Sequence, residues 1–227
     1  MIFQAFEHIF HGAWVVQAAF VAGLLLILAS VAVRKRLAGN DGGVLPDEGF
    51  TFRNLFEVIV EWLAGMAQDR MGPDWRKYFP IVGTMFFFIL VSNLMGLVPG
   101  LAGATSDANT TFAWAIIAWL LYTAIGVTTH GFKYVQKFLG PKSVWPLAPF
   151  FFILEVPLDL ARILTLGIRL LANMFADHTV VAVWLGLIPI GVPAIFMGLG
   201  VVIAFLQAFV FALLTMIYIG LALEEPH

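Results

Sequence analysis

Arg169 lies inside a long apolar stretch near the end of this chain, and it is the residue whose position has the strongest chemical consequence. Placing an arginine at membrane depth costs about 2.5–3.5 kcal/mol on insertion scales. A guanidinium stays protonated at physiological pH, so it cannot escape this cost by becoming neutral. Because intramembrane charges usually face a partner or a water-filled pathway, Arg169 predicts a functional site.

Other polar side chains gather around Arg169. On a helix that turns about 100° per residue, seven of them share an arc of about 120°, namely Glu155, Asp159, Arg162, Thr165, Arg169, Asn173 and Asp177. His178 lies on the opposite side of the same helix. Two interpretations stay open for part of this arc. It could line a pathway, or its first three charged members, at i, i+4 and i+7, could neutralise one another as a buried network.

No neighbour of Arg169 along the chain compensates its positive charge. The positions three and four residues away carry no carboxylate, and the final apolar run, 195–223, has no charged residue. We therefore expect the compensating carboxylate to come from a partner subunit. Gln207 is the one strongly polar side chain in the middle of that final run, and it could either serve the site or only join two helices. His178 could exchange protons or be a histidine satisfied by backbone carbonyls.

The composition indicates a membrane environment. The chain has 227 residues, of which 61% are hydrophobic and 11% charged, and its mean hydropathy is +0.96. A soluble domain would contain about 25% charged residues. The net charge of −2 gives no reason to expect a nucleic-acid partner, and the lack of cysteine excludes disulfides and thiolate metal sites. His8 and His11 are two ligands without a third, so we expect no metal. No nucleotide loop or nucleophile–base pair is present, so we expect neither a cofactor nor enzymatic activity.

The hydropathy pattern predicts an all-α polytopic membrane protein that forms a single domain without internal repeats. Its apolar runs predict five transmembrane helices, at 12–33, 78–99, 111–129, 146–188 and 193–223. The first has 22 residues and reaches about 33 Å, enough for a hydrocarbon core of about 30 Å. The uncharged part of the last run reaches about 43 Å, so we expect tilt, a break or extension beyond the membrane. Small residues recur there every four positions, which permits close helix packing, at Gly200, Ala204, Ala208 and Ala212.

The segment 50–69 has a different pattern. Arg53, Glu57 and Glu61 recur every four residues among large apolar side chains. A helix with this narrow charged stripe is amphipathic, and we expect it to lie along the cytoplasmic membrane interface. A sixth full span is the alternative.

The distribution of lysine and arginine predicts the orientation. Ten of the twelve follow the first or the third predicted span, where they form two basic stretches. The positive-inside rule places both stretches in the cytoplasm. The N-terminus is then outside, and five crossings place the C-terminus inside. No basic region precedes the first apolar run, so we expect a retained helix and not a cleaved signal peptide.

Several motifs, in order along nearly the whole chain, resemble one known family. They are Phe-Ile-Leu-Val-Ser-Asn-Leu-Met-Gly-Leu-Val-Pro-Gly at 88–100, Asp-Ala-Asn-Thr-Thr at 107–111, Leu-Gly-Ile-Arg-Leu-Leu-Ala-Asn-Met-Phe-Ala at 166–176, and Leu-Gln-Ala-Phe-Val-Phe at 206–211, continued by Leu-Thr-Met-Ile-Tyr at 214–218. The family is subunit a of the membrane (Fo) sector of rotary F-type ATP synthases. The resemblance implies a bacterial-type inner (plasma) membrane as the location. It also implies a long, tilted hairpin of the last two helices beside the c-ring, with the peripheral-stalk b subunits, the rest of the complex and the bilayer as further partners.

The resemblance also implies roles for the polar residues. Arg169 would face the ring carboxylates and stop protons from passing directly between two aqueous half-channels, and Gln207 would orient it. Glu155 would lie on the cytoplasmic half-channel, and Asn173, Asp177 and His178 on the outside one, with Asp107 near its mouth. Asp159, Arg162 and Thr165 complete the predicted proton path.

The sequence departs from the family at one place. Many members pair a glutamate at the position of His178 with a histidine on the last helix, and others exchange the two. Here the last-helix position is Gly200. His178 could then act alone, with water, or with Asp177 or Asp107. Two other function classes fit less well: a self-contained transporter predicts internal repeats and broken helices, and an intramembrane hydrolase predicts a catalytic residue pair.

Overall fold

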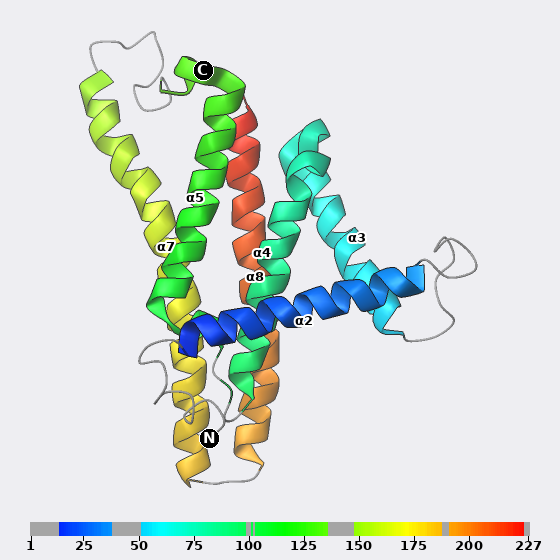
Figure 1. The fold of residues 1–227 in the computed structure, drawn as a ribbon. Helices are drawn as coiled ribbons and strands as arrows, with labels where there is room; N and C mark the ends of the chain where they lie inside the picture. The colour runs from blue at the N-terminus through cyan, green and yellow to red at the C-terminus, as the bar shows by residue number, and fades with distance from the viewer. Residues whose placement is uncertain are drawn as a thin grey trace.

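The computed structural model describes residues 14–37, 51–98, 101, 103–135, 148–187 and 191–224, and their regular structure is entirely helical (Figure 1). The long helices are α2 (Trp14–Leu37), α3 (Phe52–Met71), α4 (Trp75–Leu97), α5 (Ala108–His130), α7 (Ala148–Leu187) and α8 (Val192–Leu223). Three short 3-10 helices connect or extend them: η1 (Gly72–Asp74), η2 (Ala104–Ser106) and η3 (Gly131–Val135). His8, His11, Lys137 and Lys142 lie outside the described residues, and of Lys35 and Arg36 only the backbone is described.

The core is built around α8, which packs against α3, α4, α5 and α7. Its second half contributes several fully buried side chains to this core, among them Phe211, Met216 and Ile219. The small residues predicted to permit close packing are buried, and the Asn93 side-chain amide of α4 donates to the Ala204 carbonyl over 3.4 Å. A side chain of α4 therefore reaches the α8 backbone at this stripe.

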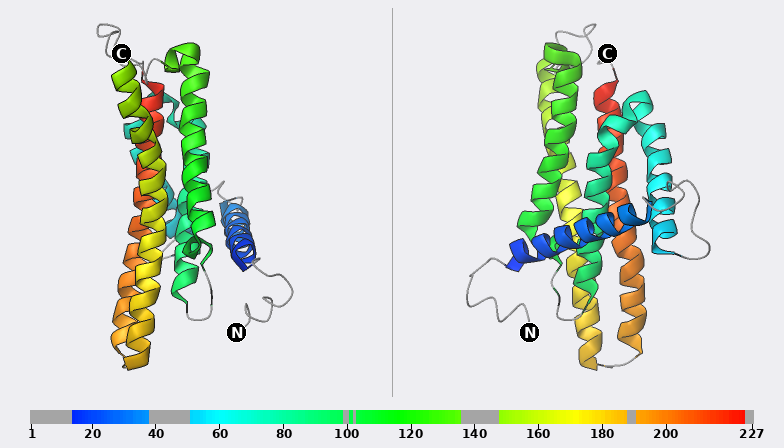
Figure 2. Two further views of the ribbon diagram at one scale, coloured as in Figure 1. Left: turned by 90° about the vertical axis from the view of Figure 1, so that its left-hand side faces the viewer. Right: turned by 45° about the vertical axis from the view of Figure 1, so that its right-hand side comes forward.

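The last two helices form a long hairpin. α7 has 40 residues and α8 has 32, which correspond to about 60 Å and 48 Å, both more than a hydrocarbon core of about 30 Å. Figure 2 shows them side by side along much of their length. Gly191 begins α8 with φ of 92°, a conformation that favours glycine, and Trp184 stacks on Phe196 close to the turn. The tilt of this hairpin in a membrane stays a prediction.

Helix α3 occupies the segment 50–69, for which the sequence predicts an amphipathic helix at the membrane interface. It turns through η1 into α4 and packs against both α4 and α8. Leu63, Ala67 and Met71 are buried in that contact, and a side chain at Gly220 of α8 would collide with the Arg70 carbonyl. Part of its apolar surface therefore covers protein, whereas Leu55, Val58 and Trp62 are exposed. Periodicity alone does not distinguish a protein surface from a membrane surface, and the place of α3 at the membrane interface stays a prediction.

The predicted number of spans is not confirmed. Four helical stretches among the described residues are long and apolar enough to cross a membrane: Trp14–Arg34, Arg53–Leu97, Ala108–His130 and Val192–Leu223. The second joins α3 and α4, and α7 with its many polar residues is not among the four. Helix α2, which continues through the first basic residues, runs across the other helices (Figures 1 and 2). Length and hydropathy do not encode this crossing direction.

Candidate functional site

Arg169 lies on the outward face of α7. Leu166 and Leu170, its neighbours along the helix, point into the core with exposed fractions of 4% and 0%, whereas Arg169 itself is exposed. It makes no hydrogen bond or ion pair with any residue that the structure describes. Thr165, one turn earlier, is exposed on the same face and donates to the Ala161 carbonyl of its own helix over 2.8 Å. A permanent positive charge therefore lies on an open apolar surface, next to the exposed side chain of Ile168.

Gln207 and Asn173 join the two helices of the hairpin. The Asn173 side-chain amide donates to the Gln207 side-chain oxygen over 2.6 Å, and Gln207 is only 4% exposed. Asn173 is four residues after Arg169, so it lies one turn away on the same side of α7. The sequence suggested that Gln207 orients Arg169. Within the described residues, its side chain bonds to Asn173, and we find no bond from Gln207 to the guanidinium.

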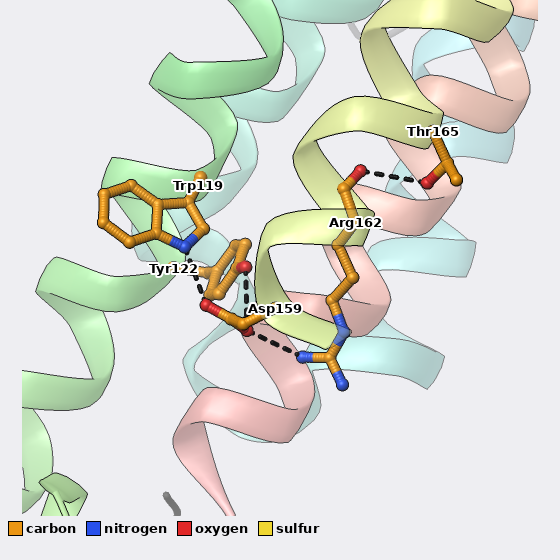
Figure 3. Close-up of polar contacts among 5 residues, drawn as sticks. All are labelled: Trp119, Tyr122, Asp159, Arg162 and Thr165. Atoms are coloured by element: carbon orange, nitrogen blue, oxygen red, sulfur yellow. Dashed lines mark hydrogen bonds and ion pairs between the residues drawn. The ribbon is translucent and has the colours of Figure 1, made fainter. Parts of the chain in front are cut away.

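Asp159 and Arg162 belong to a separate cluster between α5 and α7 (Figure 3). The Asp159 carboxylate is almost fully buried and accepts three hydrogen bonds, from Trp119 Nε1 at 2.7 Å, Tyr122 OH at 3.2 Å and Arg162 Nη1 at 3.1 Å. The Arg162 guanidinium also lies 5.2 Å from the centre of the Tyr218 ring of α8, within cation–π range. A carboxylate with this many donors is well satisfied, and its charge balances that of Arg162.

The structure therefore divides the polar arc that the sequence predicted. The neutral-network interpretation holds for Asp159 and Arg162, whereas Glu155 is partly exposed and has no hydrogen bond or ion pair with a described residue. Trp119 and Tyr122 were missed by sequence reasoning. Their only signal is a spacing of three residues in an apolar helix, which places an indole N–H and a phenol on one face.

Asp177 and His178 lie at a pocket of about 210 Å³, which is further lined by Gly96, Leu97, Val98, Leu101, Val181, Ala182 and Leu185. The His178 ring packs against Gly96 of α4, and its Nε2 atom is buried without a hydrogen-bond partner among the described residues. Asp107 does not line this pocket. Its carboxylate instead caps α5 by accepting from the Asn109 N–H over 2.8 Å.

A second buried polar link was also missed. The Thr105 hydroxyl donates to the Asn93 side-chain oxygen over 2.7 Å, and Asn93 in turn donates to α8. This link fastens the segment that follows α4 to the core. No group of three or more potential metal ligands occurs among the described residues.

Comparison with known proteins gives a consistent result. A family model described as ATP synthase A chain matches residues 15–220. The chain is 38% identical over 208 residues to "ATP synthase subunit a" of Bdellovibrio bacteriovorus, which covers 91% of this chain and 90% of that protein. It is 39% identical over 223 residues to "ATP synthase subunit a 1" of Syntrophotalea carbinolica, covering 97% and 91%. It is 42% identical over 207 residues to "ATP synthase subunit a" of Geotalea uraniireducens, covering 91% and 86%. The chain therefore belongs to the ATP synthase A chain family.

Proposed function

We propose that this chain is the stator subunit a of a rotary F-type ATP synthase and that it conducts protons to and from the carboxylates of the c-ring. Family membership supports the place of this chain in an ATP synthase complex, and one observation supports the mechanism. Arg169 is a permanent cation on an exposed apolar face and has no partner among the described residues. A ring of helices that each bear a carboxylate would supply the missing negative charge, and ATP chemistry would belong to other subunits.

The charge acts on a passing carboxyl group. A cation within about 4–6 Å lowers a carboxyl pKa by about 1–3 units, and each unit corresponds to about 1.36 kcal/mol. A protonated ring carboxyl that reaches Arg169 would therefore release its proton. Because guanidinium does not deprotonate, the same charge would block protons from passing along the stator without using the ring.

The polar residues on α7 would serve two separate half-channels. Glu155 precedes Arg169 by 14 residues and Asp177 follows it by eight, which corresponds to about 21 Å and 12 Å along the helix. With the predicted orientation, Glu155 would lie on the cytoplasmic side and Asp177 with His178 on the outside. Asn173 and Gln207 would connect the outside group to Arg169. We assign Asp159 and Arg162 a structural role, because their charges compensate each other. The b subunits and the bilayer would bind the remaining surface.

The test is ATP-driven proton pumping by reconstituted complexes that carry Arg169→Ala. We expect pumping to be abolished while the complex stays assembled with its c-ring. Arg169→Lys should also pump poorly, since a desolvated ammonium can lose its proton. Arg76→Ala changes an exposed arginine at the start of α4 and is the control that should pump normally. Normal pumping by an assembled Arg169→Ala complex would refute the proposed function.

A further inference from the structure

The side of α7 opposite Arg169 rests on an aromatic ring of α5. Gly167 precedes Arg169 by two residues, which is about 200° around the helix, so the two lie on nearly opposite sides. Arg169 is exposed, whereas Gly167 is buried. A Cβ atom built on Gly167 would lie 2.8 Å from Cδ1 and 3.0 Å from Cε1 of Phe112. The Phe112 ring therefore takes the space that a side chain would need at position 167.

The packing next to this contact leaves little room for adjustment. Phe112 lies in the second turn of α5, just after the turn that the Asp107 carboxylate caps. Farther along α5, Ala115 and Ala118 are each 1% exposed. Together with Leu166 of α7 they line a void of only about 10 Å³, which is about the space that one water molecule needs. The two helices therefore have almost no slack beside Gly167.

The contact between Phe112 and Gly167 is close to Arg169 along the helix. Two residues correspond to about 3 Å of rise, whereas the ten residues from Asp159 to Arg169 correspond to about 15 Å. A change in the spacing of α5 and α7 at Gly167 would therefore move the guanidinium by a similar amount, toward or away from a partner on the exposed face. A change at the Asp159 cluster would reach Arg169 only in part.

We propose that Phe112 is a positioning residue for Arg169: its ring, seated against Gly167, sets how far α7 stands from α5 and so how far the guanidinium reaches toward the c-ring. This inference rests on the proposed function, in which the guanidinium must come within about 4–6 Å of a ring carboxylate. A phenyl ring has no titratable group, so Phe112 acts through α7 and exchanges no proton itself.

The size of the expected effect follows from the contact distances. Non-bonded carbon atoms prefer about 3.5–4.0 Å, so the methyl of Gly167→Ala would push α7 and the ring apart by about 1 Å. A displacement of this size can cost about 10²-fold in rate. Phe112 is only partly buried and can yield in part, so we expect Gly167→Ala to slow pumping at least about fivefold. Alanine is a better helix former than glycine, so the substitution does not weaken α7 itself.

The experiment measures ATP-driven proton pumping per assembled complex. Phe112→Leu removes ring atoms that the new methyl would meet, so the double variant Gly167→Ala with Phe112→Leu should pump at least about threefold faster than Gly167→Ala. Gly186→Ala, on the same helix with no atom within 4 Å of the added methyl, is the control that should pump normally. A contact that served only stability would change the amount of assembled complex and leave pumping per complex unchanged in every variant.

The outcomes separate this inference from the proposed function. Normal pumping by assembled Gly167→Ala complexes would overturn it, as would a double variant no faster than Gly167→Ala. If Arg169→Ala abolishes pumping in the same series, only the role of Phe112 has failed; if Arg169→Ala pumps normally, the proposed function has failed as well.

A second variant tests the contact from the side of α5. Should Gly167→Ala not assemble, Phe112→Ala leaves a void behind α7, and it must slow pumping per assembled complex at least about threefold. Normal pumping by Phe112→Ala would also overturn the inference.

Discussion

Replacing Asp159 by alanine should loosen the contact between α5 and α7 while proton transport per assembled complex stays close to normal. The substitution removes the acceptor for three donors at once, Trp119 Nε1, Tyr122 OH and Arg162 Nη1. It also leaves the Arg162 guanidinium without its ion-pair partner. If this cluster holds the helices together and does not carry protons, stability and transport should respond differently.

The size of the effect follows from the number of bonds. Polar contacts between helices in a membrane contribute about 0.6 kcal/mol each on average, so the two that reach Asp159 from α5 give about 1.2 kcal/mol. The bond from Arg162 lies within α7. Removing one partner of a buried ion pair in a soluble protein costs more, about 3–5 kcal/mol. The Arg162 side chain is 28% exposed and can turn toward a more polar region. The estimate from the contacts between helices therefore applies, and not the larger cost of a buried ion pair. A loss of about 1.2 kcal/mol lowers the equilibrium constant for the packed state about eightfold.

The assay is retention of this subunit in the detergent-solubilised complex as temperature rises. Asp159→Ala should release it at a lower temperature, and Asp159→Asn should do so less, because the amide oxygen can still accept from Trp119. Trp119→Phe keeps a ring but removes the N–H. The double variant Asp159→Ala with Trp119→Phe should lose less stability than the sum of the losses of the two single variants. Glu155→Ala, one turn away and without a hydrogen-bond partner among the described residues, is the stability control that should leave retention unchanged.

Two outcomes would refute this reasoning. Transport per assembled Asp159→Ala complex that falls as far as in Arg169→Ala would place Asp159 on the proton path. Unchanged thermal retention would show that the cluster contributes nothing to helix packing.

Two further predictions concern orientation and the hairpin. Because the native chain has no cysteine, Lys133→Cys gives a single site for a thiol reagent. We expect the reagent to reach it only from the cytoplasmic side. Labelling from the outside alone would reverse the predicted topology. Gln207→Leu removes the 2.6 Å bond to Asn173 and should reduce pumping severalfold, with Asn173→Ala similar and the double variant no worse than either. Additive losses would mean that the two residues act separately.

The long helices were predictable because their apolar runs are long and nearly free of charge. The predicted 78–99, 111–129 and 193–223 correspond to α4, α5 and α8 within a few residues at each end. Helix periodicity also placed the polar residues of α7 on one side. These features depend on local sequence, which fixes helix length and which side chains share a face.

The remaining features depend on which helices meet. The sequence offered no reason to pair Asp159 with Trp119, since they are 40 residues apart and only the packing of α5 on α7 brings them together. The closeness of the Asp177 carboxylate to Gly200 likewise depends on the relative rotation of α7 and α8. For α3, the same amphipathic pattern fits a membrane surface or a protein surface, and the choice depends on α4 and α8.

The central position of α8 has a consequence for biosynthesis. The helix that contacts α3, α4, α5 and α7 is made after all four of them. At about 5–20 residues per second, its 32 residues take about 2–6 s to emerge, and until then α3, α4, α5 and α7 lack the helix that all four of them contact. During the same interval the side-chain amides of Asn93 and Asn173 lack their hydrogen-bond acceptors, the Ala204 carbonyl and the Gln207 side-chain oxygen. A ribosome that stops before α8 would therefore release helices that lack the buried side chains of Phe211, Met216 and Ile219 among them.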